Sequence, residues 1–418
     1  MNREELAARY GTPLYVYDLD RVADACHDLT AALPERFSLF YALKANPHPR
    51  VAEAVRENVP GTCRAEISSS GELAAALAAG FPAADCLYTG PGKTAGELAQ
   101  AVADGVRLFS AESPGDLRRI GAAALAGGAV ADCLIRVNSA SATASTSIRM
   151  TGTPSQFGFD SELLDAPAPG ILDVPGTRIV GAHFFPLSNA REEDDLIAEF
   201  TNSITVAADV ERRLGIRLSL LDLGGGFASP YAAPGQRPRY TRLRAALESA
   251  LDEHFPRWRT GGLEIACESG RYLVGDSGSL LTRVVNTKVS RGKTFHVLDA
   301  GINTLGGMSG LGRLLPTSAR PAEDTGATAE PERPSATASL VGPLCTPGDI
   351  LGRELGLPQL CADDLVTLPN VGAYGLTASL LMFLGRPAPA EVTLRGGAVA
   401  TASRIEHIRV DVRPRNLD

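Results

Sequence analysis

Three short segments carry side chains whose types and spacing suit chemistry on a phosphorylated, nitrogen-containing ring. Lys44 directly follows an apolar run, and a desolvated lysine amine at such a position favours Schiff-base chemistry. Gly224–Gly226 follows another apolar run, and consecutive glycines let backbone N–H groups close around a phosphate. Glu268 and Arg271 offer a carboxylate for a cationic ring nitrogen and a guanidinium for a phosphate.

Each of these features has a simpler explanation when it is taken alone. Glycine runs are common in turns, an acid and an arginine can form a structural ion pair, and a lone lysine is usually a solvated charge. The features gain weight only if the fold brings them to one place, so the elements that precede them decide the interpretation.

The chain up to about residue 267 alternates short apolar runs with amphipathic stretches. Eight runs are predicted strands: Phe37–Leu43, Cys63–Ile67, Cys86–Thr89, Val106–Ser110, Asp132–Val137, Arg178–Phe185, Leu218–Leu223 and Leu263–Cys267. Helical patterns lie between them at Gly71–Ala79, Ala95–Asp104, Leu196–Leu214 and Tyr240–His254. This alternation predicts an α/β fold, a (β/α)8 TIM barrel, with a doubly wound open sheet as the alternative. In a barrel, the chemical groups above would follow the first, seventh and eighth strands and meet at one mouth.

After about Gly275 the pattern changes to apolar segments with turns and few helical stretches, which predicts a mostly antiparallel β domain. Leu14–Tyr17 is expected to add a strand to it, and Thr317–Thr337, rich in Pro, Ala, Glu and Ser, predicts a mobile excursion. We therefore expect a barrel domain over residues 30–275 and a β-sandwich or β-barrel domain over 276–418, with an N-terminal strand from 1–29. The other predicted strands are Leu280–Val285, Thr294–Leu298, Ala338–Val341, Leu365–Leu368 and Val392–Leu394.

Composition argues against several classes of protein. The net charge of −8 gives no overall basic surface for nucleic acid, and no apolar stretch approaches the roughly 20 residues of a membrane span. The N-terminal residues lack the apolar run of a signal peptide, so we expect a cytoplasmic protein. The 7 cysteines form no C-x-x-C pair and the 6 histidines no H-E-x-x-H, which predicts neither a disulfide framework nor a metal site.

The combined motifs resemble the fold-type III, alanine-racemase-like enzymes that use pyridoxal 5'-phosphate (PLP), and within them the diaminopimelate/ornithine decarboxylase family. The resemblance runs from Gly11 to Tyr374 and rests on the segments YALKAN, AEISSSGEL, LDLGGGF, ESGRYLV, GPLCTPGD and GAYG. It implies an alanine-racemase-like barrel followed by a β domain, a PLP cofactor, and a homodimer with shared active sites.

The resemblance also assigns roles to single positions. Lys44 would carry the cofactor, Glu268 would pair with the ring nitrogen, and Glu66 would lie beside the cofactor where the family more often has Asp. Cys345, supplied by a partner subunit, would protonate the substrate carbanion, and Asp349 would shape its loop. The phosphate would be held by Ser188, Gly224, Gly225, Gly226, Gly270, Arg271 and Tyr374.

Three departures from the family concern the substrate. Thr346 stands where the diamine-forming members have an acid that reads the distal ammonium. Phe185 replaces the imidazole that stacks on the cofactor ring, while His183 is expected to be an ordinary core histidine. A glycine-rich stretch precedes Arg313 where an arginine for the substrate carboxylate is expected, which leaves room for a larger substrate. Arg313, Thr346 and Asp349 are the expected substrate contacts.

These departures favour a narrower resemblance, to decarboxylases of antibiotic biosynthesis that act on an aminoacyl group tethered to an acyl carrier protein. The butirosin-type glutamyl-carrier-protein decarboxylase is the example. We therefore predict α-decarboxylation of a glutamyl- or aspartyl-type group on a carrier protein, with an arginine rim using Arg149 or Arg313. The alternatives are a free amino acid decarboxylase such as diaminopimelate decarboxylase, and a non-catalytic PLP-binding regulator.

Overall fold

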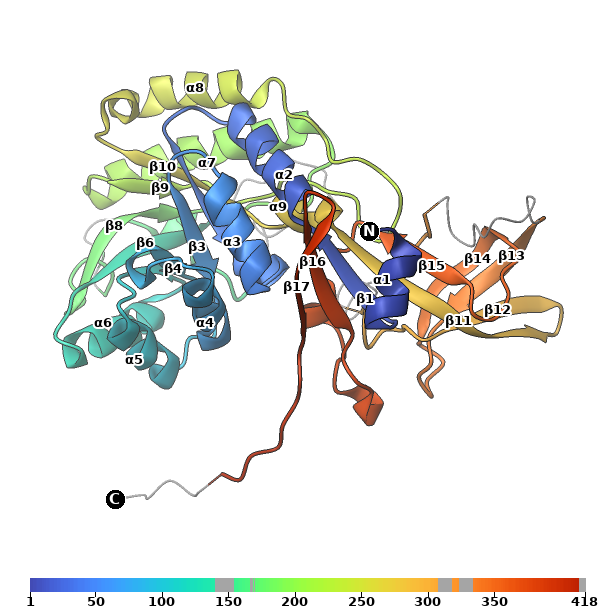
Figure 1. Cartoon of the computed structure of the whole chain (residues 1–418). Coiled ribbons are helices and arrows are strands. Elements are labelled where there is room, and N and C mark those ends of the chain that lie inside the picture. The colour runs from blue at the N-terminus through green and yellow to red at the C-terminus, as the bar shows by residue number, and fades with distance from the viewer. Residues whose placement is uncertain (140–153, 166–167, 169, 307–317, 323–333, 413–418) are drawn as a thin grey trace. The chain divides into compact units, whose positions relative to one another are not determined.

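The computed structural model describes residues 1–139, 154–165, 168, 170–306, 318–322 and 334–412 (Figure 1). The chain forms two compact units. The barrel unit comprises Leu19–Tyr231 and Gly235–Ser277, and the β unit comprises Met1–Asp18, Ala232–Pro234 and Gly278–Asp418. Within the described residues, no helix combines the length and apolar character needed to cross a membrane.

The barrel unit contains a closed parallel barrel, which confirms the expected (β/α)8 fold. Its strands pair in the order β2–β3–β4–β5–β6–β8–β9–β10, and β10 pairs with β2 to close the ring. Because every neighbouring pair is parallel, the C-terminal ends of all these strands form one mouth. The strands are β2 (Phe37–Ala42), β3 (Cys63–Ile67), β4 (Cys86–Tyr88), β5 (Leu108–Ala111), β6 (Ala131–Asn138), β8 (Thr177–His183), β9 (Leu220–Asp222) and β10 (Glu264–Ser269), and the short β7 (Phe159–Asp160) pairs with β6.

Helices alternate with these strands, and short polar residues fix where several begin. Thr94 and Glu97 form a reciprocal capping box at the start of α5, while the Ser69 and Ser113 side chains cap α4 and α6. The helices of this unit are α2 (Leu19–Ala32), α3 (Pro49–Asn58), α4 (Ser70–Ala78), α5 (Ala95–Asp104), α6 (Pro114–Ala126), α7 (Glu193–Leu214), α8 (Leu243–His254) and α9 (Arg271–Val274).

An apolar layer fills the barrel below its mouth. It is a buried cluster with one residue from each of five strands: Phe40, Leu87, Leu134, Leu220 and Ala266. Residues two apart on a strand point to the same face, so the next inward-facing position on each strand lies one layer closer to the mouth. Several of those positions are polar, and they form the site described below.

The β unit is mostly antiparallel, as expected. Its sheet has the strand order β14–β13–β12–β11–β1–β16–β17, and β15 also pairs with β11. The pairs β1–β16 and β12–β13 are parallel. The elements are α1 (Arg3–Tyr10), β1 (Leu14–Asp18), β11 (Gly278–Ser290), β12 (Lys293–Leu298), β13 (Ser335–Val341), β14 (Ile350–Pro358), β15 (Leu365–Pro369), β16 (Ala390–Arg395) and β17 (Ala398–Arg404).

The predicted strands lie close to the observed ones, with two differences of substance. Strands β14 and β17 were not predicted, because glycine and charged residues interrupt β14 and small residues dilute the apolar pattern of β17. Residues 335–337, assigned to an excursion, are instead the first residues of β13 and pair with β14. The rest of that predicted excursion lies mostly outside the described residues.

Candidate active site

The polar layer of the barrel follows directly from strand alternation. Thr89, Arg136, Asp222 and Glu268 each come two residues after a member of the apolar layer. All four are buried. The same mouth receives Lys44, in the turn Leu43–Ala45 after β2. The barrel therefore gathers a buried guanidinium and two buried carboxylates beside a lysine amine at its mouth.

Lys44 is held by a buried carboxylate on the next strand. Its Nζ lies 2.9 Å from Oε2 and 3.1 Å from Oε1 of Glu66, the last but one residue of β3. The Glu66 side chain is 2% exposed, whereas that of Lys44 is 36% exposed. Thr89 and Ser68 also donate hydrogen bonds to Glu66 Oε1. This arrangement orients the lysine amine while leaving part of it open at the mouth.

A second carboxylate, on α4, lies near the first. Glu72 accepts the backbone N–H of Ser68 at 2.6 Å. Burial, with the charge of Glu66 beside it, raises the pKa of Glu72 to about 7. Glu72 can therefore take up or release a proton near neutral pH close to the Lys44–Glu66 pair.

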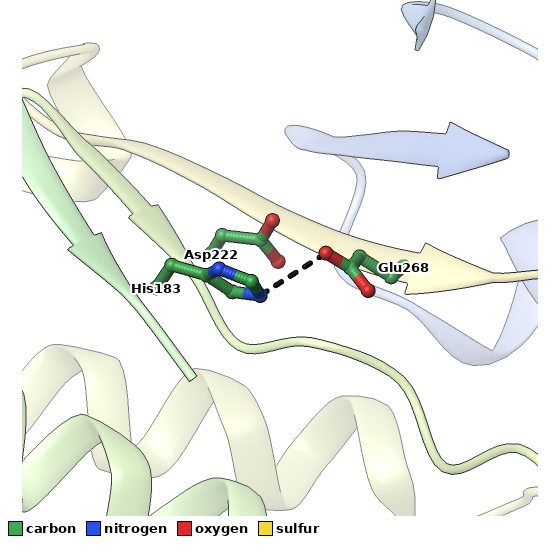
Figure 2. A group of neighbouring side chains, drawn as sticks. All are labelled: His183, Asp222 and Glu268. Carbon is green, nitrogen blue, oxygen red and sulfur yellow. Dashed lines mark ion pairs between the residues drawn. The ribbon is translucent and has the colours of Figure 1, made fainter. Parts of the chain in front are cut away.

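Glu268 belongs to a buried cluster that spans three strands (Figure 2). Its Oε1 lies 3.1 Å from Nε2 of His183, a close contact whose alignment is not that of a regular hydrogen bond. The Ser110 hydroxyl lies 2.7 Å from the other ring nitrogen, Nδ1. Burial alone would raise the pKa of Glu268, but His183, Lys44 and Arg136 together lower it. Glu268 is therefore held as an anion, and His183 is buried, as expected of a core histidine, in contact with that carboxylate.

Asp222 completes this cluster from β9. It is fully buried, and its Oδ1 accepts the backbone N–H of Gly224 at 2.8 Å. Burial, with the nearby charge of Glu268, raises the pKa of Asp222 to about 7. Two neighbouring carboxylates thus have pKa values pushed in opposite directions.

Phe185, directly after β8, presents an aromatic ring to the same space. The Lys44 Nζ lies 5.1 Å from its ring centroid and the Arg136 Cζ lies 5.9 Å from it. Arg136 is held by Glu112, whose Oε1 lies 3.0 Å from the guanidinium Nη1. The Arg136 Cζ also lies over the Phe157 ring, 4.6 Å from its centroid. Stacking of this ring on the cofactor stays a prediction.

The glycine triplet follows β9 and makes close contacts that require the absence of side chains. Gly224 has φ +74°, and a Cβ there would lie 2.1 Å from the Phe184 carbonyl oxygen. A Cβ on Gly225 would lie 2.9 Å from the Glu268 carbonyl oxygen, and one on Gly226 would lie 2.5 Å from Leu187. Gly270, Arg271 and Ser188 belong to the same unit. Gly270 packs against Ala45, Arg271 is buried and Ser188 is half-buried.

These residues fit pyridoxal phosphate on chemical grounds. They supply an amine to hold an aldehyde, a buried anion for a ring nitrogen, an aromatic ring for stacking, and a glycine loop free of side chains for a phosphate. All of them lie in the barrel unit.

The β unit carries Cys345 on a loop that Asp349 holds in place. The Asp349 carboxylate is buried and accepts the backbone N–H of Ile302 at 2.8 Å and of Leu344 at 2.7 Å. A Cβ on Gly301 or Gly342 would collide with this carboxylate. Asp349 therefore shapes the loop, and its contact with substrate stays a prediction. Thr346 is half-buried on the same loop.

The seven cysteines differ in exposure. Cys345 and Cys361 are exposed, Cys63 is intermediate, and Cys26, Cys86, Cys133 and Cys267 are buried. Tyr374, also in the β unit, is half-buried and has φ +53°. Arg149 and Arg313 lie outside the described residues, so their expected roles stay predictions.

Several polar residues of the site were not assigned from sequence. They are Ser68, Thr89, Ser110, Glu112, Arg136 and Asp222, all at or near strand ends. Ser68 lies in AEISSSGEL and Asp222 in LDLGGGF, but neither was given a role, and the other four belong to none of the quoted segments. The signal that could have found four of them is alternation, because Thr89, Ser110, Arg136 and Asp222 each come two residues after an inward apolar position.

Comparisons with known proteins agree with this chemistry. The family model described as "Pyridoxal-dependent decarboxylase, pyridoxal binding domain" matches residues 19–275. A decarboxylase of Niallia circulans that acts on an L-glutamyl group of an acyl-carrier protein is 32% identical, over 94% of this chain and 91% of that protein. A diaminopimelate decarboxylase of Methanothermobacter thermautotrophicus is 30% identical, over 99% of this chain and 94% of that protein.

Solved structures show the same architecture. Diaminopimelate decarboxylase from Helicobacter pylori, complexed with L-lysine, superposes with a TM-score of 0.80 at 27% identity, covering 96% of this chain and 95% of that one. With a closed barrel, a lysine and an acid at its mouth, and a family match over the whole barrel, this chain belongs to the pyridoxal-dependent decarboxylases and is a lyase that uses pyridoxal phosphate.

Proposed function

We propose that the substrate is an acidic aminoacyl group, of glutamyl or aspartyl type, tethered to an acyl carrier protein. The observation that carries this proposal is Thr346, which follows Cys345 where the diamine-forming members of the family have an acid. A threonine cannot compensate a desolvated ammonium, so a free diamino acid would lose several kcal/mol of binding. The similarity to the glutamyl-carrier-protein decarboxylase supports the same substrate.

The site residues would divide the work as follows. Bound pyridoxal phosphate supplies an electron sink for the pair left when the Cα–carboxylate bond breaks. Lys44 would hold the cofactor and Glu268 would keep a proton on its ring nitrogen. The thiol of Cys345 would give a proton to Cα after carbon dioxide leaves, and its loop would do so in the barrel of a second subunit. The product would be a β- or γ-amino acyl group on the carrier.

Carrier proteins are acidic, so the proposal includes a basic rim that uses Arg149 or Arg313. Neutralising these arginines is expected to weaken carrier binding most at low salt, because screening reduces the contribution of exposed charges. Unchanged affinity at every ionic strength would count against such a rim.

A free amino acid decarboxylase is the second candidate, favoured by diaminopimelate decarboxylases that match this chain at 28–31% identity over most of its length. Intact-mass measurement distinguishes the two. The loaded enzyme is incubated with free diaminopimelate, ornithine, lysine, arginine, glutamate and aspartate, and separately with glutamyl, aspartyl and methylaspartyl groups on a phosphopantetheinylated carrier.

Loss of the mass of carbon dioxide from the carrier panel alone is the expected result, and it identifies the acyl group. Loss from a free diamino acid would overturn the proposal. The Lys44→Ala variant is the control in both panels, because any loss that persists without the lysine amine does not come from this site.

A further inference from the structure

Asp222 occupies an unusual position for a carboxylate. It is fully buried, one of its oxygens accepts the Gly224 N–H, and the other, Oδ2, has no hydrogen-bond partner among the residues that the structure describes. Figure 2 shows its side chain between His183 and the strand that carries Glu268. A ligand atom of each of the three residues lies within 4.8 Å of those of the other two.

Two carboxylates this close cannot both ionise cheaply in a site without solvent, because each charge is desolvated and each repels the other. The surroundings decide which one holds the charge. Glu268 has His183 at 3.1 Å and the cations Lys44 and Arg136 acting on it. Asp222 has one backbone N–H, and the charges that face it include two acids, Glu268 from β10 and Glu66 from β3, besides His183 from β8. The thiol of Cys267, on β10, also neighbours it.

We propose that Asp222 is a positioning residue that acts in its protonated, neutral form and joins the Glu268–His183 pair to the first amide of the glycine loop. Oδ1 accepts the Gly224 N–H, and Oδ2, which has no hydrogen-bond partner among the described residues, would carry the proton within a cluster whose ligand atoms lie within 4.8 Å of one another. Asp222 would thereby fix the distance between Glu268, which would pair with the ring nitrogen, and the glycine loop, which would bind the phosphate. The opposite pKa directions of the two carboxylates agree with this assignment.

This assignment concerns cofactor binding and does not depend on the substrate. A result that contradicts it would therefore leave the proposal of a carrier-bound substrate untouched. It predicts different consequences for two variants of similar size. Asp222→Asn keeps an acceptor for Gly224 and a donor in place of the Oδ2 proton, and carries no charge. Asp222→Leu keeps a similar volume and removes both the acceptor for the Gly224 N–H and the second polar atom.

The first readout is the dissociation constant of pyridoxal phosphate from the refolded or apo enzyme, followed by the absorption band of the bound cofactor. Asp222→Asn is expected to bind within about threefold of the natural chain with the same band, and Asp222→Leu at least tenfold more weakly. His183→Gln should shift the band, because Glu268 loses the imidazole beside it, while Asn202→Asp on α7 should change neither value. Weakening by Asp222→Asn equal to that by Asp222→Leu would overturn the assignment, because the charge itself would then matter.

The second readout needs no cofactor and survives if the leucine variant does not fold. The infrared difference between the natural chain and Asp222→Asn at pH 6 should contain the carbonyl stretch of a protonated carboxylic acid. A difference spectrum with only carboxylate bands would overturn the assignment.

Discussion

Thr346 is the single residue on which the substrate proposal turns. The loop that carries it is held by Asp349, whose oxygens accept two backbone N–H groups, while the Thr346 hydroxyl adds only a long contact of 3.4 Å from the Gly348 N–H. Substrate preference should therefore respond to this position alone, without loss of folding.

Thr346→Asp is expected to raise kcat/KM for free diaminopimelate by about 10- to 100-fold, because a carboxylate there can pair with the distal ammonium. The measurement is steady-state decarboxylation of the free acid and of the carrier-bound group. Thr346→Asn is the matched control, being similar in shape and uncharged. An equal rise in kcat/KM in both variants would mean that a negative charge at this position does not recognise the distal ammonium.

At the same scale, sequence could supply the residues that belong to motifs. Lys44, Glu268 and the glycine triplet were assignable because several residues around each carry the resemblance. Ser110, Arg136 and Asp222 were not, because their importance comes from which strands become neighbours in the closed barrel. His183 was assigned to the core and is buried, yet its contact with Glu268 could be seen only once β8 and β10 were placed.

At the scale of the elements, strand β16 carries a buried ionisable side chain, Glu391. Its side chain is buried and accepts a hydrogen bond of 3.0 Å from the hydroxyl of Tyr17 on β1. Burial raises the pKa of Glu391 to about 7, and the Tyr17 hydrogen bond only partly offsets this. In the unfolded chain the same carboxyl ionises near its ordinary pKa, so folding stability falls as pH rises from about 4.5 through 7.

Glu391→Gln removes that cost because an amide cannot ionise. The variant is expected to be more stable than the natural chain by about 1–3 kcal/mol at pH 8, with no difference at pH 4. Denaturant unfolding at both pH values measures it. Tyr17→Phe is the companion variant, and it should destabilise the chain at pH 8 because the ionised Glu391 loses the hydroxyl donor of Tyr17. A pH-independent gain from Glu391→Gln would contradict this explanation.

Sequence predicts strand positions well where apolar residues dominate a run. It predicts them less well where a strand is stabilised mainly by hydrogen bonds to its partner strand. The barrel strands are mostly buried, so their sequences are mainly apolar, with polar residues such as Glu66 and Asp222 at single positions. β14 and β17 face solvent on one side and contain glycine, alanine or charged residues, so only their partners β13 and β16 identify them as strands. Register in both pairs is also irregular, which no period-2 pattern predicts.

For the whole molecule, the proposal requires that two chains share each active site. Lys44→Ala and Cys345→Ala should each be nearly inactive alone. After the two are mixed and allowed to exchange subunits, half of the dimers should contain one intact site, which restores about a quarter of the natural activity. Activity plotted against the mole fraction of one variant, over mixtures on both sides of equal amounts, should follow a parabola with its maximum at equal amounts.

No recovery after verified exchange would place Lys44 and Cys345 of one chain in the same site, and would overturn the shared arrangement. Sedimentation of labelled chains shows independently that exchange took place. The control is the double variant Lys44→Ala/Cys345→Ala mixed with the natural chain. Its mixed dimers contain no intact site if the sites are shared, and one intact site if Lys44 and Cys345 of the same chain work together.

Because the cysteines differ in burial, selective alkylation can be used to count the active sites of this protein. Burial raises the pKa of Cys63, Cys86 and Cys133 to about 12 and raises those of Cys26 and Cys267 as well, so these thiols hold almost no thiolate at neutral pH. A small alkylating reagent should then label only the exposed Cys345 and Cys361 of the folded chain. With Cys361→Ser, each molecule of reagent consumed would report one Cys345, and activity plotted against label would give the fraction of chains that are competent in any preparation.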